Sequence, residues 1–107
     1  MAWTVEVKET AVAHLQWFGK KTGRKLLKKA LEYLEQDPLA TTKNLKTLRP
    51  NPVADRELRL FGMYRVLFAI DEDANLVTII LVGEKRGNQL LVMGEEFSEH
   101  HESDPLE

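Results

Sequence analysis

Two apolar runs in the second half of the chain, joined by a short polar segment, limit what this sequence can fold into. The first is YRVLFAID, residues 64 to 71, and the second is LVTIILVG, residues 76 to 83. Short apolar, β-branched runs bounded by turn residues are typical of strands. The second run is almost continuously apolar, as expected for a central strand covered on both faces. The pair therefore predicts a β-hairpin at the centre of a sheet.

The N-terminal part of the chain predicts a strand and a first helix. AWTVEV alternates apolar and polar side chains, which favours a strand over residues 2 to 8. Thr10 is suited to cap a helix that ends before Gly19, because a hydroxyl can accept a hydrogen bond from a free N–H group at a helix start. The side chains expected to face inward are Val12, Leu15, Trp17 and Phe18.

A second helix is predicted over TGRKLLKKALEYLEQDP, residues 22 to 38. Thr22 can cap its start, and the Asp37-Pro38 pair ends it because the residue before a proline avoids the helical conformation. Its apolar stripe has helical spacing and consists of Leu26, Leu27, Ala30, Leu31 and Leu34. The side chains expected on the opposite, solvent-facing side are Lys25, Lys28, Lys29 and Glu32.

The remaining segments predict the other parts of a sheet. Residues 39 to 55 contain two prolines and are expected to form a loop, whereas RELRLF, residues 56 to 61, alternates as a strand does. After residue 88 the sequence is compatible with a short strand or a short helix. The expected fold is therefore α+β, with two N-terminal helices packed on a small, mostly antiparallel sheet in the order β-α-α-β-β-β and a short C-terminal element.

A single domain is expected over residues 1 to 94, because 107 residues suffice for one core between two layers. Residues 95 to 107 contain six acidic residues and no lysine or arginine, so we expect an acidic C-terminal tail. The side chains expected in the core are Trp3, Val5, Leu15, Leu27, Leu31, Leu34, Val66, Phe68, Ile70, Val77, Ile79 and Leu81.

Composition excludes several classes of protein. The chain has no cysteine, which excludes a disulfide scaffold and a thiolate zinc site and fits the cytoplasm. Its longest apolar run is too short to cross a membrane as a helix, and its start lacks the pattern of a secretory signal, so no membrane partner is expected. Nothing in the sequence indicates a metal or a small-molecule cofactor. Adjacent His100 and His101 rarely point at one ion.

Charge is unevenly distributed along the chain. The net charge is −2, but six of the 17 acidic residues lie after residue 94, so the body of the chain is basic. Basic residues concentrate between residues 20 and 49 and can attract a polyanion, although such runs are also typical of solvated helix faces. The candidates for nucleic-acid contacts are Lys20, Lys21, Lys25, Lys28, Lys29 and Lys46.

Arginines within the apolar strands are the candidates for chemistry. Side chains alternate along a strand, and a tight turn at residues 61 to 63 would bring Arg59 and Arg65 to one surface. The segment GEKRGN is expected to form a loop that brings Lys85 and Arg86 to the same patch. Each arginine can instead be solvated or paired with a neighbouring acid such as Glu57, because an unpaired buried guanidinium is costly.

The order of these segments resembles the RelE/ParE superfamily of bacterial type II toxins, and most closely its RelE and HigB-type members. The specific part is YRVLFAID followed by VTIILVGEKRGN, within a match over residues 2 to 88. The resemblance implies a cytoplasmic toxin that cuts messenger RNA on the ribosome and is neutralised by a cognate antitoxin laid over the sheet and its cations. It also implies that Arg65, Lys85 or Arg86, and Arg59 contact the scissile phosphate.

One element of the family pattern is missing. RelE-like nucleases generally carry a tyrosine or histidine after the basic segment as a general acid, whereas this chain has QLLVMGEEF there. Glu57 can serve as a base, and His100 or His101 can replace the acid if the C-terminal segment folds back. The alternatives are a ParE-like inhibitor of DNA gyrase without catalysis, or an inactive toxin-like module that binds a partner.

Overall fold

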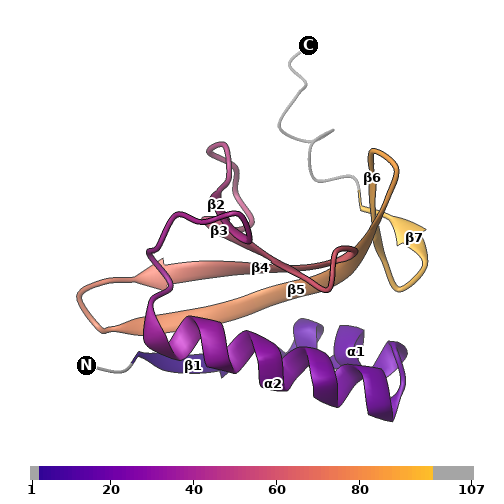
Figure 1. The fold of residues 1–107 in the computed structure, drawn as a ribbon, viewed down its shortest axis with the longest axis horizontal. Coiled ribbons are helices and arrows are strands. Elements are labelled where there is room, and N and C mark those ends of the chain that lie inside the picture. Colours follow the sequence, from indigo (N-terminus) through magenta and orange to yellow (C-terminus); the bar gives the residue numbers. More distant parts are fainter. Residues whose placement is uncertain (1–2, 98–107) are drawn as a thin grey trace.

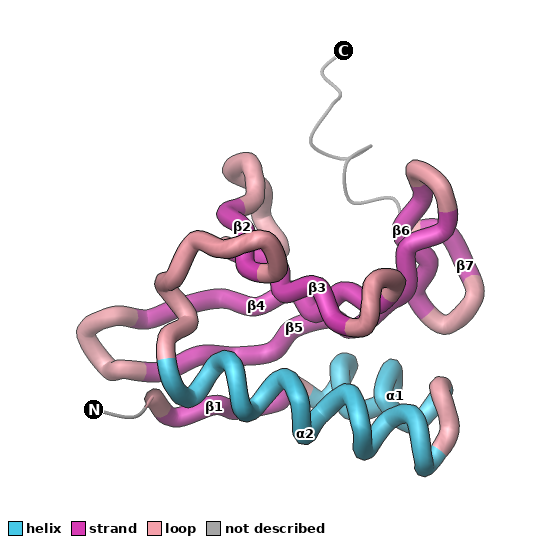
Figure 2. Tube along the Cα trace, in the orientation of Figure 1, coloured by secondary structure: helices cyan, strands magenta, loops and turns pink. Residues whose placement is uncertain are grey.

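The computed structural model describes residues 3 to 97 as two helices and one twisted sheet (Figures 1 and 2). The helices are α1 (Glu9–Trp17) and α2 (Lys20–Gln36). The strands are β1 (Thr4–Val7), β2 (Leu45–Thr47), β3 (Arg56–Leu60), β4 (Tyr64–Asp71), β5 (Leu76–Arg86), β6 (Gln89–Val92) and β7 (Glu95–Glu96). No helix in this part of the chain is long and apolar enough to span a membrane.

The sheet has the order β2-β3-β4-β5-β6-β7, with all these neighbours antiparallel, and β1 pairs with β5 in parallel. The α+β class and the central antiparallel strands are therefore confirmed. The prediction of a loop over residues 39 to 55 is wrong where β2 pairs with β3. Of the two alternatives for the C-terminal element, the structure has the strand, β6.

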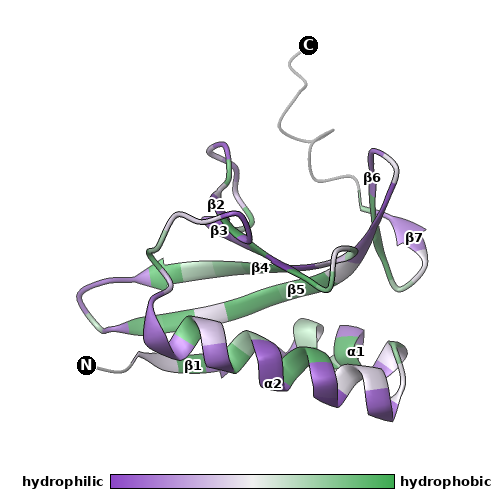
Figure 3. Cartoon of the chain, viewed as in Figure 1, coloured by the Kyte–Doolittle hydropathy of each residue, from purple (hydrophilic) through white to green (hydrophobic). Residues whose placement is uncertain are grey.

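The helices cover one face of the sheet (Figure 1), and the main core lies between the two layers. Phe68 is fully buried and Ile79 is 1% exposed, which confirms the sheet register expected from the alternation. On α2 the buried positions are Gly23, Leu26, Ala30 and Leu34, about one turn apart, so the apolar side of this helix faces the sheet (Figure 3). The predicted core residues that are only half-buried are Trp3, Val5, Leu15, Leu27, Leu31 and Ile70.

A second, smaller core lies on the other face of the sheet. Its buried members are Ala54, Leu67 and Leu81, and Phe97 packs against them. Leu81 belongs to this second core because Ile80 is the extra residue of a β-bulge, at which the pairing shifts between β4 and β5. The position of Phe97 corrects the prediction that the tail begins at residue 95. Residues 95 to 97 join the sheet, and the rest of the predicted tail lies outside the described residues.

The helix starts differ from the predicted ones. The residues at the cap positions are Lys8 and Gly19, not Thr10 and Thr22, and neither helix has a side-chain cap. The Thr10 hydroxyl instead donates a hydrogen bond to the carbonyl of Ile80, 3.2 Å away. Val12 and Trp17 were expected to face inward but are 39% and 47% exposed. Only Ala11 is fully buried on α1, which lies along β5 and bonds the backbone of Ile80 and Val82 through Thr10 and His14.

Candidate functional site

The hairpin of β3 and β4 places two arginines side by side. Arg59 pairs directly with Arg65 across the two strands, as the alternation predicts. Leu58 and Leu60 point the other way, into the main core, so the two arginines occupy the sheet face opposite the helices.

Lys85 joins the same face, but from a strand rather than a loop. The predicted loop at GEKRGN is wrong, because β5 continues as far as Arg86. Arg65 pairs with Gly83, and Lys85 lies two residues further along the strand, so its side chain is on the Arg65 face. Arg86 alternates to the other face, where it lies 3.6 Å from Glu84.

Lys46 and Glu57 complete this surface. They are direct partners across β2 and β3, and Glu57 is on the same side of β3 as Arg59. We define the basic face by its five charged residues on four neighbouring strands: Lys46, Glu57, Arg59, Arg65 and Lys85.

Glu57 holds both arginines through one oxygen atom. Arg59 Nε donates a hydrogen bond of 2.9 Å to Glu57 Oε2, and Arg65 Nε lies 3.2 Å from the same oxygen. Arg65 Nε is buried and makes no hydrogen bond of acceptable geometry with the described residues. One carboxylate therefore serves two guanidinium groups, and the cluster retains the capacity to bind a further anion.

Arg65 is more enclosed than the sequence suggested. Its side chain is only 12% exposed, and its Nη1 donates hydrogen bonds to the carbonyls of Gly62 and Tyr64. Burial lowers the pKa of Arg65 and neighbouring Arg59 lowers it further, whereas Glu57 acts in the opposite direction. Of the alternatives left open for Arg65, the structure without a ligand has the one in which it pairs with Glu57. Arg59, at 44% exposure, is the more accessible of the two.

The predicted nucleic-acid-binding lysines separate into two groups. Lys46 is on the basic face, whereas the other five lie on α2, in the opposite layer. Lys29 is engaged by Glu32 at 3.1 Å, and Lys25 lies 4.6 Å from the ring centroid of Phe61. Because the sheet separates α2 from the basic face, the α2 lysines and the four cations of the basic face cannot all meet one phosphate.

No tyrosine or histidine lies on the basic face within residues 3 to 97. Leu90 and Leu91 occupy the strand that follows the basic segment. Tyr64 points to the helix side, and His14 is on α1, where its Nδ1 accepts a hydrogen bond from the N–H of Val82. His100 and His101, considered as replacement acids, lie outside the described residues.

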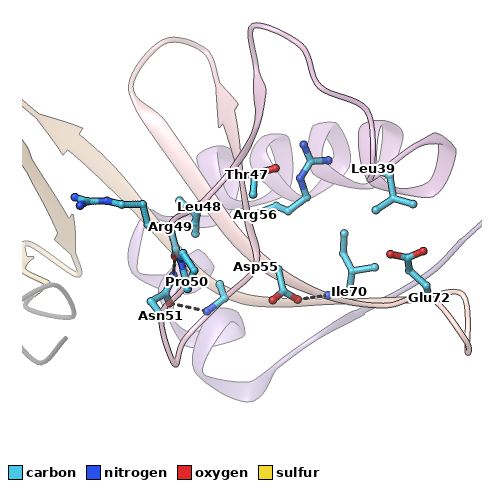
Figure 4. A pocket seen from close by; sticks show the side chains of 11 residues that line it. Leu39, Thr47, Leu48, Arg49, Pro50, Asn51, Asp55, Arg56, Ile70 and Glu72 are labelled. Carbon is cyan, nitrogen blue, oxygen red and sulfur yellow. Dashed lines mark hydrogen bonds between the residues drawn. The ribbon is translucent and has the colours of Figure 1, made fainter.

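A cavity of about 600 Å³ lies elsewhere, beside the outer ends of β2 and β3 (Figure 4). None of the basic-face residues lines it. Its polar groups are largely engaged within the chain: Asp55 accepts a hydrogen bond from the N–H of Ile70, and the buried Arg56 donates one to the carbonyl of Pro38. Residues 3 to 97 contain no cluster of three or more side chains suited to a metal ion.

The chain is a small α+β protein with cations on its strands, and several solved structures have a similar fold. No protein-family profile and no curated protein sequence matches it. A chain of the RelBE2 toxin-antitoxin complex from Mycobacterium tuberculosis aligns with a TM-score of 0.68 and 26% identity, over 79% of this chain and 93% of that one. A chain of the archaeal RelE-RelB complex from Pyrococcus horikoshii OT3 aligns with a TM-score of 0.62 and 26% identity, over 81% and 98%.

Free E. coli toxin RelE, in a mutant form, has the same fold, with a TM-score of 0.60 and 21% identity over 99% of this chain and 96% of that one. At this identity it supports the fold alone, whereas the likeness to chains of the two toxin-antitoxin complexes supports a RelE-like type II toxin.

Proposed function

We propose that this chain inhibits translation in the cytoplasm by cutting messenger RNA on the ribosome and that a cognate antitoxin neutralises it. The observation that carries the proposal is that Arg59, Arg65 and Lys85 lie on one sheet face, where Glu57 pairs with both arginines. Cations fixed on strands suit a phosphate whose charge grows during the reaction. Forked guanidinium donors also match the geometry of phosphate oxygens.

The chemistry requires no metal in this proposal. The 2′-hydroxyl of the substrate attacks the adjacent phosphorus, the bond to the 5′-oxygen breaks, and a 2′,3′-cyclic phosphate forms. Arg59 and Lys85 are the accessible cations for the phosphate, with Arg65 behind them. Glu57, the carboxylate of the basic face, is proposed to take the proton of the 2′-hydroxyl. Solvent water supplies the proton to the departing 5′-oxygen in this proposal.

The antitoxin is proposed to cover the basic face with acidic or apolar side chains. The two RelE-like chains aligned above come from complexes with antitoxins, which supports such a partner. The lysines Lys20, Lys21, Lys25 and Lys28 of α2 are proposed to contact ribosomal RNA rather than the scissile phosphate. They lie in the layer opposite the basic face.

A second candidate function follows from the absence of a tyrosine or histidine on the described basic face. A ParE-like inhibitor of DNA gyrase would need no general acid. The two candidates predict different first effects after expression of the protein is induced in a culture. Amino-acid incorporation falls first if the chain acts on translation, and plasmid supercoiling changes first if it acts on gyrase.

A direct test is in vitro translation with primer extension on the messenger. Wild-type protein should produce discrete cleavage sites that require ribosomes, and Lys85→Ala should reduce cleavage on the order of 100-fold. Glu35→Gln, on the exposed side of α2, serves as the matched control. Intact messenger together with inhibited gyrase would replace this proposal with the second candidate.

A further inference from the structure

Phe61 has a backbone conformation that its side chain does not favour. It begins the turn between β3 and β4 with a φ of 50°, and Gly62 follows with a φ of 80°. Left-handed conformations are routine for glycine and asparagine but cost other residues about 1 kcal/mol or more. A bulky aromatic residue here is unexpected unless its ring has a use.

Burial does not supply that use, because Phe61 remains 47% exposed. Among residues 3 to 97, its ring contacts Lys25 of α2, whose Nζ lies 4.6 Å from the ring centroid. A cation–π contact at an exposed site contributes about 0.5–1 kcal/mol, which at best offsets the backbone strain. The contact places a positive charge beside the ring.

The ring is physically connected to the basic face. Phe61 follows Arg59 by two residues, so their Cα atoms are at most about 7 Å apart. Arg65 Nη1 donates a hydrogen bond of 2.9 Å to the carbonyl of Gly62, which ties this turn to the buried arginine. The exposed ring lies on the α2 side of this turn and is linked to the arginines through the backbone of residues 59 to 62. Single-stranded RNA is commonly bound by a combination of stacking and charge, and here the two would act on either side of the turn.

We propose that Phe61 is a stacking platform for a nucleobase of single-stranded RNA next to the phosphate held by Arg59, Arg65 and Lys85. The inference rests on the proposed function, since it places the base in the same substrate. Lys25 of α2 contacts the ring, and the strained turn links it through the backbone to the arginines. A nucleobase offers the planar face that an exposed aromatic ring stacks on.

The test uses two fluorescently labelled RNA hexamers, one intact and one with a central abasic nucleotide, at low salt. The full-length wild type should bind the intact hexamer roughly 5- to 100-fold more tightly than the abasic one, because stacking contributes about 1–3 kcal/mol per base. Phe61→Leu and Phe61→Asn should abolish this preference, and Phe61→Trp should retain it. Equal binding of both hexamers by the wild type, or a preference retained by Phe61→Leu, would overturn the inference.

Thermal unfolding of the same variants separates this role from a structural one. Phe61→Asn relieves the left-handed strain, so its unfolding temperature should equal or exceed that of the wild type while the base preference is lost. A lowered unfolding temperature in Phe61→Asn would assign the ring a structural role instead. Arg65→Ala should weaken binding of both hexamers equally. If the wild type bound neither hexamer, this inference would fail, whereas the proposed function is tested separately by ribosome-dependent cleavage of the messenger. Equal binding of both hexamers would likewise overturn the stacking site alone.

Discussion

Glu57 Oε2 and Arg65 Nε lie 3.2 Å apart, diagonally across β3 and β4, and the two side chains are only 16% and 12% exposed. The same oxygen accepts the hydrogen bond from Arg59. Before any ligand binds, the carboxylate therefore occupies the place where an anion would neutralise both arginines. A substrate phosphate must compete with Glu57 for them, so this residue affects both the stability of the sheet and the affinity of the basic face.

Replacing Glu57 with Gln should lower stability and strengthen anion binding together. The change leaves two neighbouring guanidinium groups, one of them largely buried, without a counter-charge, and should reduce the free energy of unfolding by about 1–3 kcal/mol. Added sulfate should recover more stability in the variant than in the wild type. Urea unfolding with and without sulfate measures both effects, with Glu35→Gln as the exposed control. If Glu57→Gln were as stable as the wild type, the ion pairs of Glu57 with Arg59 and Arg65 would contribute nothing to the free energy of unfolding.

Replacing either arginine of the pair with alanine should separate burial from function. Arg65→Ala should cost about 1–3 kcal/mol, because it removes a largely buried group and its bonds to the turn carbonyls. Arg59→Ala should cost no more than about 1 kcal/mol, because Arg59 is far more exposed.

Both alanine variants should fail to inhibit growth if Arg59 and Arg65 contact the phosphate. Denaturant unfolding and a plate assay of the same variants provide the two measurements. A folded Arg59→Ala variant with full inhibition would remove this residue from the site.

The alternation of side chains explains why part of this site could be predicted from the sequence. Which face Arg59 and Arg65 share depends only on local strand geometry and a tight turn. The carboxylate they share could not be fixed in the same way, since several acids lie within reach of a strand arginine and rotamers decide among them. The sequence also predicted a β5 that is too short. Gly83 suggested a turn, whereas in the structure the strand continues through Gly83 to Arg86.

The bulge at Ile80 had no local signal at all. It depends on α1, which supplies the hydroxyl of Thr10 to the carbonyl of Ile80 and the imidazole of His14 to the N–H of Val82. These two side chains bond backbone groups of β5 beyond the end of its pairing with β1. Contacts between residues about 70 positions apart are set by tertiary packing, which the periodicity of either segment does not report.

Gly83→Ala should displace β6 from β5. A Cβ atom at Gly83 would lie 2.6 Å from the carbonyl oxygen of Leu91 and 3.2 Å from the side chain of Leu90, so the backbone of β6 must move. Overpacking of this kind commonly costs about 1–3 kcal/mol. Hydrogen exchange should show faster exchange of the amides that pair β5 with β6 than of those that pair β3 with β4. Unchanged protection throughout would mean that β6 adjusts without cost.

His14 should make the fold sensitive to mild acid. Its Nδ1 accepts a hydrogen bond from the N–H of Val82 at 3.2 Å, which only an unprotonated Nδ1 can do, and burial lowers its pKa below the ordinary 6.5. The unfolded chain therefore takes up this proton first as the pH falls. Stability from His14 is complete above about pH 6.5 and declines below it, by at most about 1.4 kcal/mol per pH unit, until the folded pKa is reached.

His14→Asn is the informative variant for this dependence. The amide oxygen of asparagine can accept the bond from Val82 without titrating. The difference in unfolding free energy between wild type and variant, measured from pH 7.5 to 5.5, isolates His14, because all other titrating groups are common to both proteins. The wild type should lose stability relative to His14→Asn as the pH falls. Parallel curves over this range would show that His14 has the same pKa in the folded and unfolded chain.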